Sequence, residues 1–377
     1  MKTRRASSLS RRRLAFAAAL CLAGGGAGAT SPEFDEPEIC SRENFGACLN
    51  GAASPVTNAA GLRASLGAHD EVARDRRKAR RGEATAGLGR REAWFAAGDA
   101  AAAPIGLWVS YNYTDAASDF AVLGTSLAFE SDAHGVLAGV DRMFGDRVLL
   151  GIAGGYTDVS ADTFYNGGGQ DNDGYTFAPY AAVLLNEIFS IDVNGGYSAL
   201  DYDQHRISPT DGTNTSAGFD ADRWFIAGNV NASLQRNNWF GNLRVGAAHA
   251  AESQDAYTEA GSAASQLGGT LRAVQDREID LTQLIVGGEV AYSAAMVEPY
   301  FTVAYHNDLS RDDDAGAGGL PGAFTVVQPS DDDEVQIGLG LRCYTTRGIT
   351  ATLEYLRVEG REAFDSESLM ATLRLAL

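Results

Sequence analysis

Residues 148–156 read VLLGIAGGY, and the larger apolar side chains of this stretch recur at every second position. One set is Val148, Leu150, Ile152 and Tyr156, and the positions between them hold Leu149, Gly151, Ala153 and Gly155. A period of two predicts a β-strand whose two faces meet different surroundings. The stretch is also about as long as a strand needs to be to cross a bilayer, which takes about nine to eleven residues.

The same alternation appears in four other segments spread over the second half of the chain. Their apolar positions are Phe189, Ile191, Val193 and Tyr197; Trp224, Ile226, Val230 and Leu234; Val335, Ile337, Leu339, Leu341 and Cys343; and Leu369, Ala371, Leu373, Leu375 and Leu377. After the N-terminal region no run of 18 apolar residues occurs, so a transmembrane helix is not expected. A membrane protein with this pattern must cross as a closed sheet, because lipid cannot satisfy open backbone groups.

The second face of these strands distinguishes a membrane barrel from a water-soluble sandwich. A sandwich would place Lys, Glu and Thr there, whereas this face carries mainly Gly, Ala, Ser, Thr and Asn with isolated charges. Small polar residues fit a narrow aqueous lumen. The predicted lumen-lining charges are Asp141, Asp192, Arg244, Glu289, Arg342, Glu354 and Arg374. We expect Arg342, Glu354 and Arg374, on successive strands, to form an ion-pair ladder.

Connection lengths support the same architecture. Short turns near 144–147, 185–188, 236–239, 294–297 and 345–348 alternate with connections near 115–132, 160–174, 203–220, 253–277, 307–333 and 360–366. Short periplasmic turns and mostly longer outer loops are typical of outer-membrane barrels. The count of strands between them is about twelve, which predicts an all-β, antiparallel, transmembrane β-barrel over residues 105–377.

Aromatic residues follow the expected membrane interfaces. Those near the predicted outer strand ends are Tyr156, Tyr175, Tyr197, Trp224, Tyr305 and Tyr355, and those near the short turns are Phe189, Trp239 and Tyr292. By the alternation of their strands, the six outer residues all fall on the apolar face. Amphipathic rings prefer the headgroup layer, so two belts of this kind indicate a membrane-spanning sheet.

The first 104 residues divide into three predicted segments. Residues 1–29 have a basic start, an apolar core and a small-residue end, which predicts a secretory signal peptide. Residues 30–58 form a short head that contains Cys40 and Cys48, which could pair in an oxidising periplasm. Residues 59–104 have helix-forming composition, although Gly82, Gly87 and Gly89 interrupt it.

The formal charge of −19 is unevenly distributed. Residues 62–92 carry a net charge of +4, whereas residues 104–377 carry −24. One interpretation is a solvated basic helix beside an acidic surface. The other places the basic segment, including Arg74 to Arg81, inside or at the mouth of an acidic pore, in contact with Asp141, Asp192 and Glu289.

Several segments together resemble the autotransporter (type V secretion) β-domain family. The resemblance covers roughly residues 100–377 and is carried by IGLWVSYNYTD from Ile105, HGVLAGVD ending at Asp141, GIAGGY ending at Tyr156, DGYTFAPYA from Asp173 and NGGYS around Tyr197. It implies a twelve-stranded barrel in the outer membrane of a Gram-negative cell, with a helix in the pore leading to an N-terminal passenger. The chain departs from the family in ending at Leu377, where an aromatic residue is usual, and in having only a short head.

Motifs that carry chemistry are not visible. His69, His134, His205, His249 and His306 lack metal-binding spacing, and no GxSxG, CxxC or GxxxxGK[ST] sequence occurs. We expect no catalytic, cofactor-binding or metal site, and so no enzyme and no cofactor. The run Tyr165–Gly174 is interpreted as a surface loop, and Asp312–Asp314 with Asp331–Asp333 as a solvated acidic loop in preference to a Ca²⁺ site.

The leading hypothesis is therefore an outer-membrane translocator for protein transport, which anchors or exports its own N-terminal segment. The alternative is a small pore or structural surface barrel without a passenger, and a barrel hydrolase ranks last. The expected partners are outer-membrane lipid, the barrel assembly machinery and periplasmic chaperones. The barrel is expected to be a monomer, and its acidity argues against nucleic acid.

Overall fold

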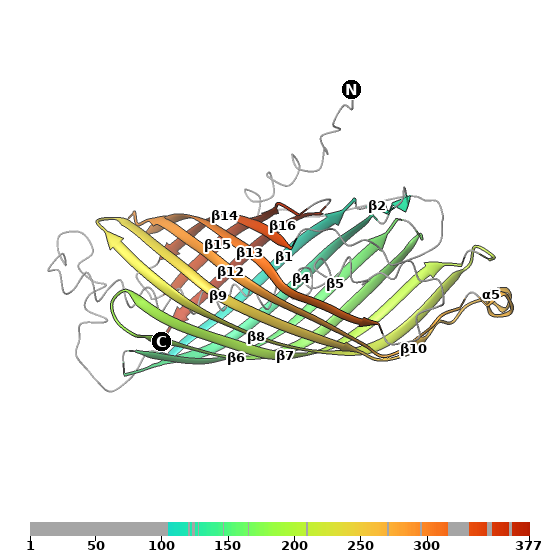
Figure 1. The fold of residues 1–377 in the computed structure, drawn as a ribbon. Helices are drawn as coiled ribbons and strands as arrows, with labels where there is room; N and C mark the ends of the chain where they lie inside the picture. The colour runs from blue at the N-terminus through green and yellow to red at the C-terminus, as the bar shows by residue number, and fades with distance from the viewer. Residues whose placement is uncertain are drawn as a thin grey trace, which may run out of the picture. The chain divides into compact units, whose positions relative to one another are not determined.

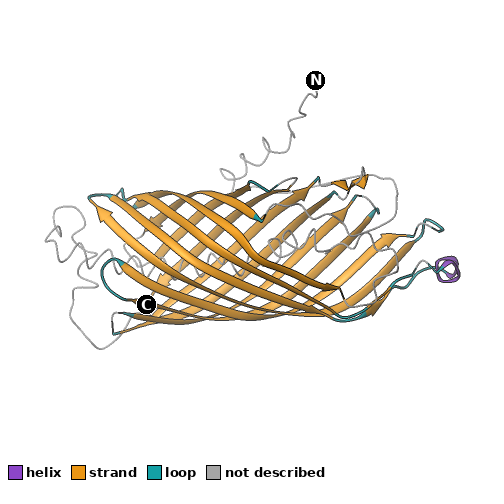
Figure 2. Cartoon of the chain, viewed as in Figure 1, coloured by secondary structure: helices purple, strands orange, loops and turns teal. Residues whose placement is uncertain are grey.

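The strands of the chain close into a single barrel (Figures 1 and 2). The structure is a computed structural model, and it describes residues 105–377 except 120, 123–124, 127, 146, 165, 209, 270, 295, 316–331, 345–348 and 362–363. The predicted segments 1–29, 30–58 and 59–104 lie outside the described residues, as does the Cys40–Cys48 pairing. Among the described residues, no helix is both long and apolar enough to cross a bilayer.

Twelve antiparallel strands make the barrel, which confirms the predicted fold class. In chain order they are β1 (Ile105–Ser118), β4 (Phe129–Phe144), β5 (Val148–Thr163), β6 (Gly168–Leu184), β7 (Phe189–Ile207), β8 (Asn214–Arg236), β9 (Trp239–Gln254), β12 (Arg277–Tyr292), β13 (Val297–Ala315), β14 (Asp333–Tyr344), β15 (Ile349–Glu359) and β16 (Phe364–Ala376). The connections add β2 (Ala121–Val122), β3 (Thr125–Ser126), β10 (Tyr257–Thr258), α5 (Ala263–Gly268) and β11 (Ala273–Val274).

Each strand pairs with its chain neighbour, and β1 closes the sheet by pairing with both β4 and β16. The two chain ends of the barrel meet at one rim, where the amides of Ile105 and Leu377 each donate to the carbonyl of the other. Ile105 also lies opposite Arg142, next to the short turn after Phe144. The barrel therefore starts and ends at the rim of the short turns.

Side-chain facing follows the alternation in the sequence. In β5, Leu150 is 47% exposed and its neighbour Leu149 only 2%. The apolar sets predicted from Phe189, Trp224, Val335 and Leu369 onward all lie on the outer face, and the residues between them point inward. The outward face is thus the apolar one, as a barrel in lipid requires.

The outer parts of several strands are longer than the sequence suggests. Segments 160–174 and 203–220 were predicted to be loops, but most of their residues belong to β5, β6, β7 and β8. The predicted loop Tyr165–Gly174 is wrong from Gly168 onward, because its backbone pairs with β5 on one side and β7 on the other. Although residues 168–174 are rich in Gly and Asp, their strand pairing continues beyond the membrane-spanning part of the barrel.

Large inward side chains lie flat over glycines of neighbouring strands. A Cβ atom at Gly151 would be 2.2 Å from Cζ of Tyr180, and one at Gly340 would be 2.1 Å from Cζ of Tyr300. Only glycine allows these rings to approach the backbone so closely. The rings in turn position the polar groups of the lumen.

Candidate functional site: the barrel lumen

The structure places the predicted lumen charges on the inward-facing sides of their strands. Asp141, Asp192 and Glu354 are buried, whereas Arg244, Glu289, Arg342 and Arg374 are partly buried. They fall into separate groups along the wall, each completed by residues that the sequence alone did not single out.

The first group joins Arg374 of β16 to Asp141 of β4 across β1. The guanidinium binds the carboxylate in a bidentate manner, with Nη1–Oδ2 and Nη2–Oδ1 distances of 2.8 and 2.5 Å. The Tyr180 hydroxyl donates to the same carboxylate at 2.9 Å and accepts a hydrogen bond from Trp108 Nε1 at 2.7 Å. Four strands are thus connected through one buried charge pair.

The second group surrounds Arg342 of β14. Its guanidinium binds Glu289 at 2.8 and 2.5 Å and Glu298 at 2.9 Å, and its Cζ lies 4.0 Å from the ring centroid of Tyr300. Glu298 is only 1% exposed and also accepts a hydrogen bond from Ser293 at 2.5 Å. A buried carboxylate needs such partners, since an unpaired charge in this position would be strongly destabilising.

The third group is centred on Asp192 of β7. Its carboxylate accepts hydrogen bonds from Asn229 at 2.7 Å and Asn231 at 2.6 Å, both from β8. Arg244 of β9 attracts it electrostatically.

These pairings differ from the predicted ladder of Arg342, Glu354 and Arg374. Arg342 binds β12 and β13, and Arg374 binds β4, while Glu354 accepts a hydrogen bond from Thr302 at 3.4 Å. The prediction was wrong because adjacency of strands does not by itself bring inward side chains together. The flat rings of Tyr180 and Tyr300 hold the arginines against other carboxylates.

The family model described as "Autotransporter beta-domain" matches residues 103–356. The chain belongs to the autotransporter β-domain family. Solved structures of autotransporter barrels share the fold. The translocator domain of NalP from Neisseria meningitidis is 13% identical with a TM-score of 0.61, covering 76% of this chain and 94% of that one. The β-domain of BrkA from Bordetella is 16% identical with a TM-score of 0.52, covering 72% and 98%.

A third structure, the transport unit of AIDA-I from Escherichia coli, is 11% identical with a TM-score of 0.50 and covers 72% of this chain and 90% of that one. Among curated protein sequences, none matches this chain significantly. The family match identifies this chain as an autotransporter translocator barrel of the outer membrane. The β-domain of this family is a transport barrel. Within the described residues, no cluster of three His, Cys, Asp or Glu side chains has metal-binding geometry.

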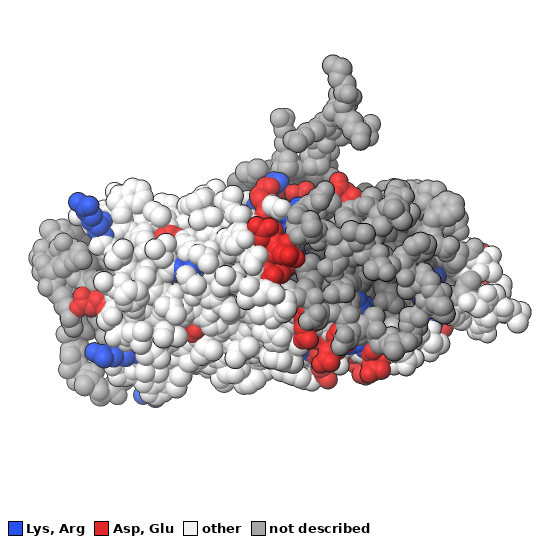
Figure 3. All heavy atoms as spheres, in the orientation of Figure 1, with Lys and Arg blue, Asp and Glu red and all other residues white. Residues whose placement is uncertain are grey.

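Among the described strand residues of this autotransporter barrel, more carboxylates face outward at the outer strand ends than face the lumen. We call the outward-facing acids of the outer strand ends the acidic collar; Figure 3 shows part of it as a band beside the uncharged surface. Its members are Asp115, Glu130, Asp132, Asp158, Asp162, Asp171, Asp173, Asp201, Asp203, Asp220, Asp222, Glu278, Asp280, Asp333, Glu359, Asp365 and Glu367. Of the predicted lumen carboxylates, most have cationic or amide partners in the wall.

The outer aromatic belt and the collar are directly bonded. Outward-facing tyrosine hydroxyls donate to collar carboxylates of the paired strand, as in Tyr156–Asp173 at 3.3 Å and in Tyr113–Asp132 and Tyr197–Asp222. In the β9–β12 pair the corresponding contact is His249–Asp280, with 3.9 Å between Nε2 and Oδ1. The belt marks the depth at which the lipid-facing surface changes from apolar to charged.

Proposed function

We propose that this barrel carries the N-terminal part of its own chain across the outer membrane. Residues 59–104 would occupy the pore, and the head, residues 30–58, would reach the cell surface. The observation that carries the proposal is the position of Ile105 at the short-turn rim. Short turns face the periplasm in such barrels, so a head displayed outside must be connected to Ile105 through the lumen.

The length of the segment suits this path. About 20 helical residues span the 30 Å hydrocarbon core, and residues 59–104 exceed that number. Even with the interruptions at its glycines, the segment can pass the membrane once.

The lumen wall also suits a basic segment. In the part of the wall nearer the short turns, the acids Asp141, Asp192, Glu289, Glu298 and Glu354 outnumber the bases Arg244, Arg342 and Arg374. The excess of negative charge in the wall is small, and most of these carboxylates already bind wall residues. The wall therefore favours a segment of net charge +4 without holding it in a deep electrostatic trap.

Two kinds of partner belong to the same proposal. Unfolded strands with one apolar face aggregate readily, so periplasmic chaperones and the barrel assembly machinery would be needed before insertion. Once closed, the barrel has no free sheet edge, which is consistent with a monomer.

Surface display can be measured with an epitope tag placed after Thr30. Protease added to intact cells should remove the tag while leaving the barrel at full size. The matched control is the same tag at Asn238, in a periplasmic turn, which should be lost only after the outer membrane is permeabilised. A tag after Thr30 that survives on intact cells would overturn the display proposal.

Pore occupancy can be measured by bilayer conductance. Deleting residues 59–92 should raise the single-channel conductance several-fold, because the remaining wall encloses an aqueous path. Equal conductance with and without the segment would contradict its place in the pore. A full-length chain that is already highly conductive would support the alternative of a small pore without a passenger.

A further inference from the structure

Two hairpins of the barrel continue well beyond the outer aromatic belt and form one unit. We call this unit the flap: residues 198–223 of β7 and β8, and residues 252–277 between β9 and β12, with α5 at its far end (Figure 1). Ser216 and Ala260 exchange backbone hydrogen bonds of 2.9 and 2.7 Å, so the β9–β12 connection extends the sheet beside β8.

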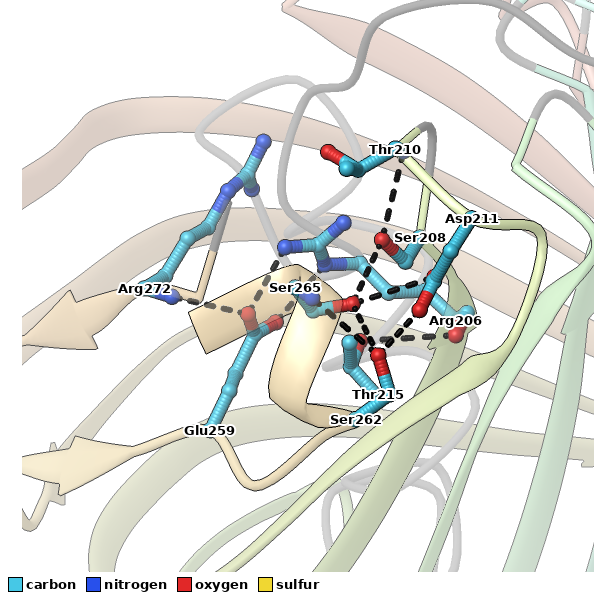
Figure 4. Close-up of polar contacts among 9 residues, drawn as sticks. All are labelled: Arg206, Ser208, Thr210, Asp211, Thr215, Glu259, Ser262, Ser265 and Arg272. Carbon is cyan, nitrogen blue, oxygen red and sulfur yellow. Dashed lines mark hydrogen bonds and ion pairs between the residues drawn. The ribbon is translucent and has the colours of Figure 1, made fainter. Parts of the chain in front are cut away.

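Side chains fasten the two hairpins together (Figure 4). Arg206 binds Glu259 in a bidentate manner with two distances of 2.7 Å. Ser265 at the start of α5 bonds Ser208 at 2.9 Å and Asp211 at 3.1 Å, and Asp211 also accepts from Ser262. The pKa of Asp211 is lowered from its usual range chiefly by the Ser262 hydrogen bond, so this fastening persists in mildly acidic medium.

The inner face of the flap combines aromatic rings with positive charge. Tyr202 stacks on Phe219 at 4.9 Å, and Phe219 on Tyr257 at 4.6 Å, with the ring planes nearly parallel. Among the described residues, the inner face carries four arginines and two glutamates: Arg206, Arg223, Arg272, Arg277, Glu252 and Glu259. Arg206 binds Glu259 and Arg223 binds Glu252, so the formal charge of this face is +2, on a domain whose overall charge is −24.

The head has the opposite charge. Residues 30–58 contain five acids and one base, for a net charge of −4, together with Phe34 and Phe45. We propose that the head, after crossing the pore, docks on the inner face of the flap. This inference rests on the proposed function, since the head reaches the flap only if it passes through the barrel.

Position and chemistry support this occupant. A chain that leaves the lumen at the outer rim meets the inward side of the strands that project furthest, which are those of the flap. Tyr257 and Arg272 are only partly buried, so an extended acidic peptide can reach them. Phe34 and Phe45 could extend the aromatic stack. The acidic collar faces outward and would repel the same peptide.

The test uses the full chain in intact cells with benzoylphenylalanine in place of Tyr257. Irradiation should cross-link position 257 to a peptide from residues 30–58. The matched control carries the photoreactive residue at Asp203, which lies on the outer face of the same extension and should give no such product. Replacing the five head acids by their amides should lower the yield at position 257 about fivefold, as should about 0.5 M salt, because screening weakens attraction between exposed charges.

A charge reversal provides a second readout that does not depend on the buried arginines. Arg272→Glu should lower the cross-link yield, and replacing the head acids by lysines in that background should restore it. Equal yields at positions 257 and 203, or a yield that ignores all head charges, would overturn docking. A head that protease removes from intact cells but that never cross-links to the flap would refute docking alone, whereas a protected tag refutes the display proposal.

Discussion

At the residue scale, the contact between Gly151 and Tyr180 controls the first charge group. Any Cβ at position 151 would displace the Tyr180 ring, and with it the hydrogen bond to Asp141. We expect Gly151→Ala to lower the free energy of unfolding by about 1–3 kcal/mol, as overpacking in tight sites does. Urea unfolding of the barrel in lipid vesicles, followed by heat-modifiable migration in gels, measures the change.

Gly154 is the matched control on the same strand. It faces outward, and the nearest atom to an added Cβ, the carbonyl oxygen of Thr176, is 3.8 Å away. Gly154→Ala should therefore change stability by much less. If both variants lose the same stability, general strand propensity of glycine explains the effect and the ring contact does not.

At the scale of elements, the carboxylate of Asp211 helps to hold the start of α5 against the turn between β7 and β8. The lowered pKa of Asp211 means that its stabilising contribution is present above the pKa of an unfolded aspartate and is lost only when pH falls through the lower folded value. Asp211→Asn should therefore speed amide hydrogen exchange in residues 261–269 at pH 7. The control Asp203→Asn removes the same charge from the outer face of β7 and should leave that exchange unchanged. Equally faster amide hydrogen exchange in both variants would contradict a specific role of Asp211 in holding α5.

Sequence reasoning recovered strands better than it recovered the connections between them. Period-two alternation locates β5 and β14 because lipid and lumen impose opposite demands on successive residues. The extended part of β6 was missed because Gly168 to Asp173 have the composition of a turn, and only pairing with both neighbours shows a strand. The Arg374–Asp141 pair spans 233 positions in the sequence, and closure of the barrel brings the two together. Local patterns carry no information on such a pair.

At the scale of the whole molecule, net charge indicated an acidic domain but not where the acid lies. Facing decides this: a carboxylate at an outward position beyond the aromatic belt joins the collar, and one at an inward position needs a wall partner. Asp141 and Asp173 differ in this way although both lie in strands. Alternation assigned Asp141 to the lumen from the sequence, whereas Asp173 fell in a predicted loop and its facing was therefore not predicted.

The collar makes the lipid surface a determinant of stability. Its carboxylates lie beside the outer aromatic belt, so anionic headgroups should repel them. We expect the urea midpoint of the barrel to be lower in vesicles rich in phosphatidylglycerol than in neutral phosphatidylcholine, and about 0.5 M NaCl should remove most of the difference. The four-site variant Asp132→Asn, Asp173→Asn, Asp222→Asn and Asp333→Asn should reduce the difference at low salt. The matched set Glu130→Gln, Asp162→Asn, Asp171→Asn and Asp203→Asn lies farther along the strands from the belt and should reduce it less. If the barrel is equally stable in both lipids at low salt, the collar does not sense the headgroup layer.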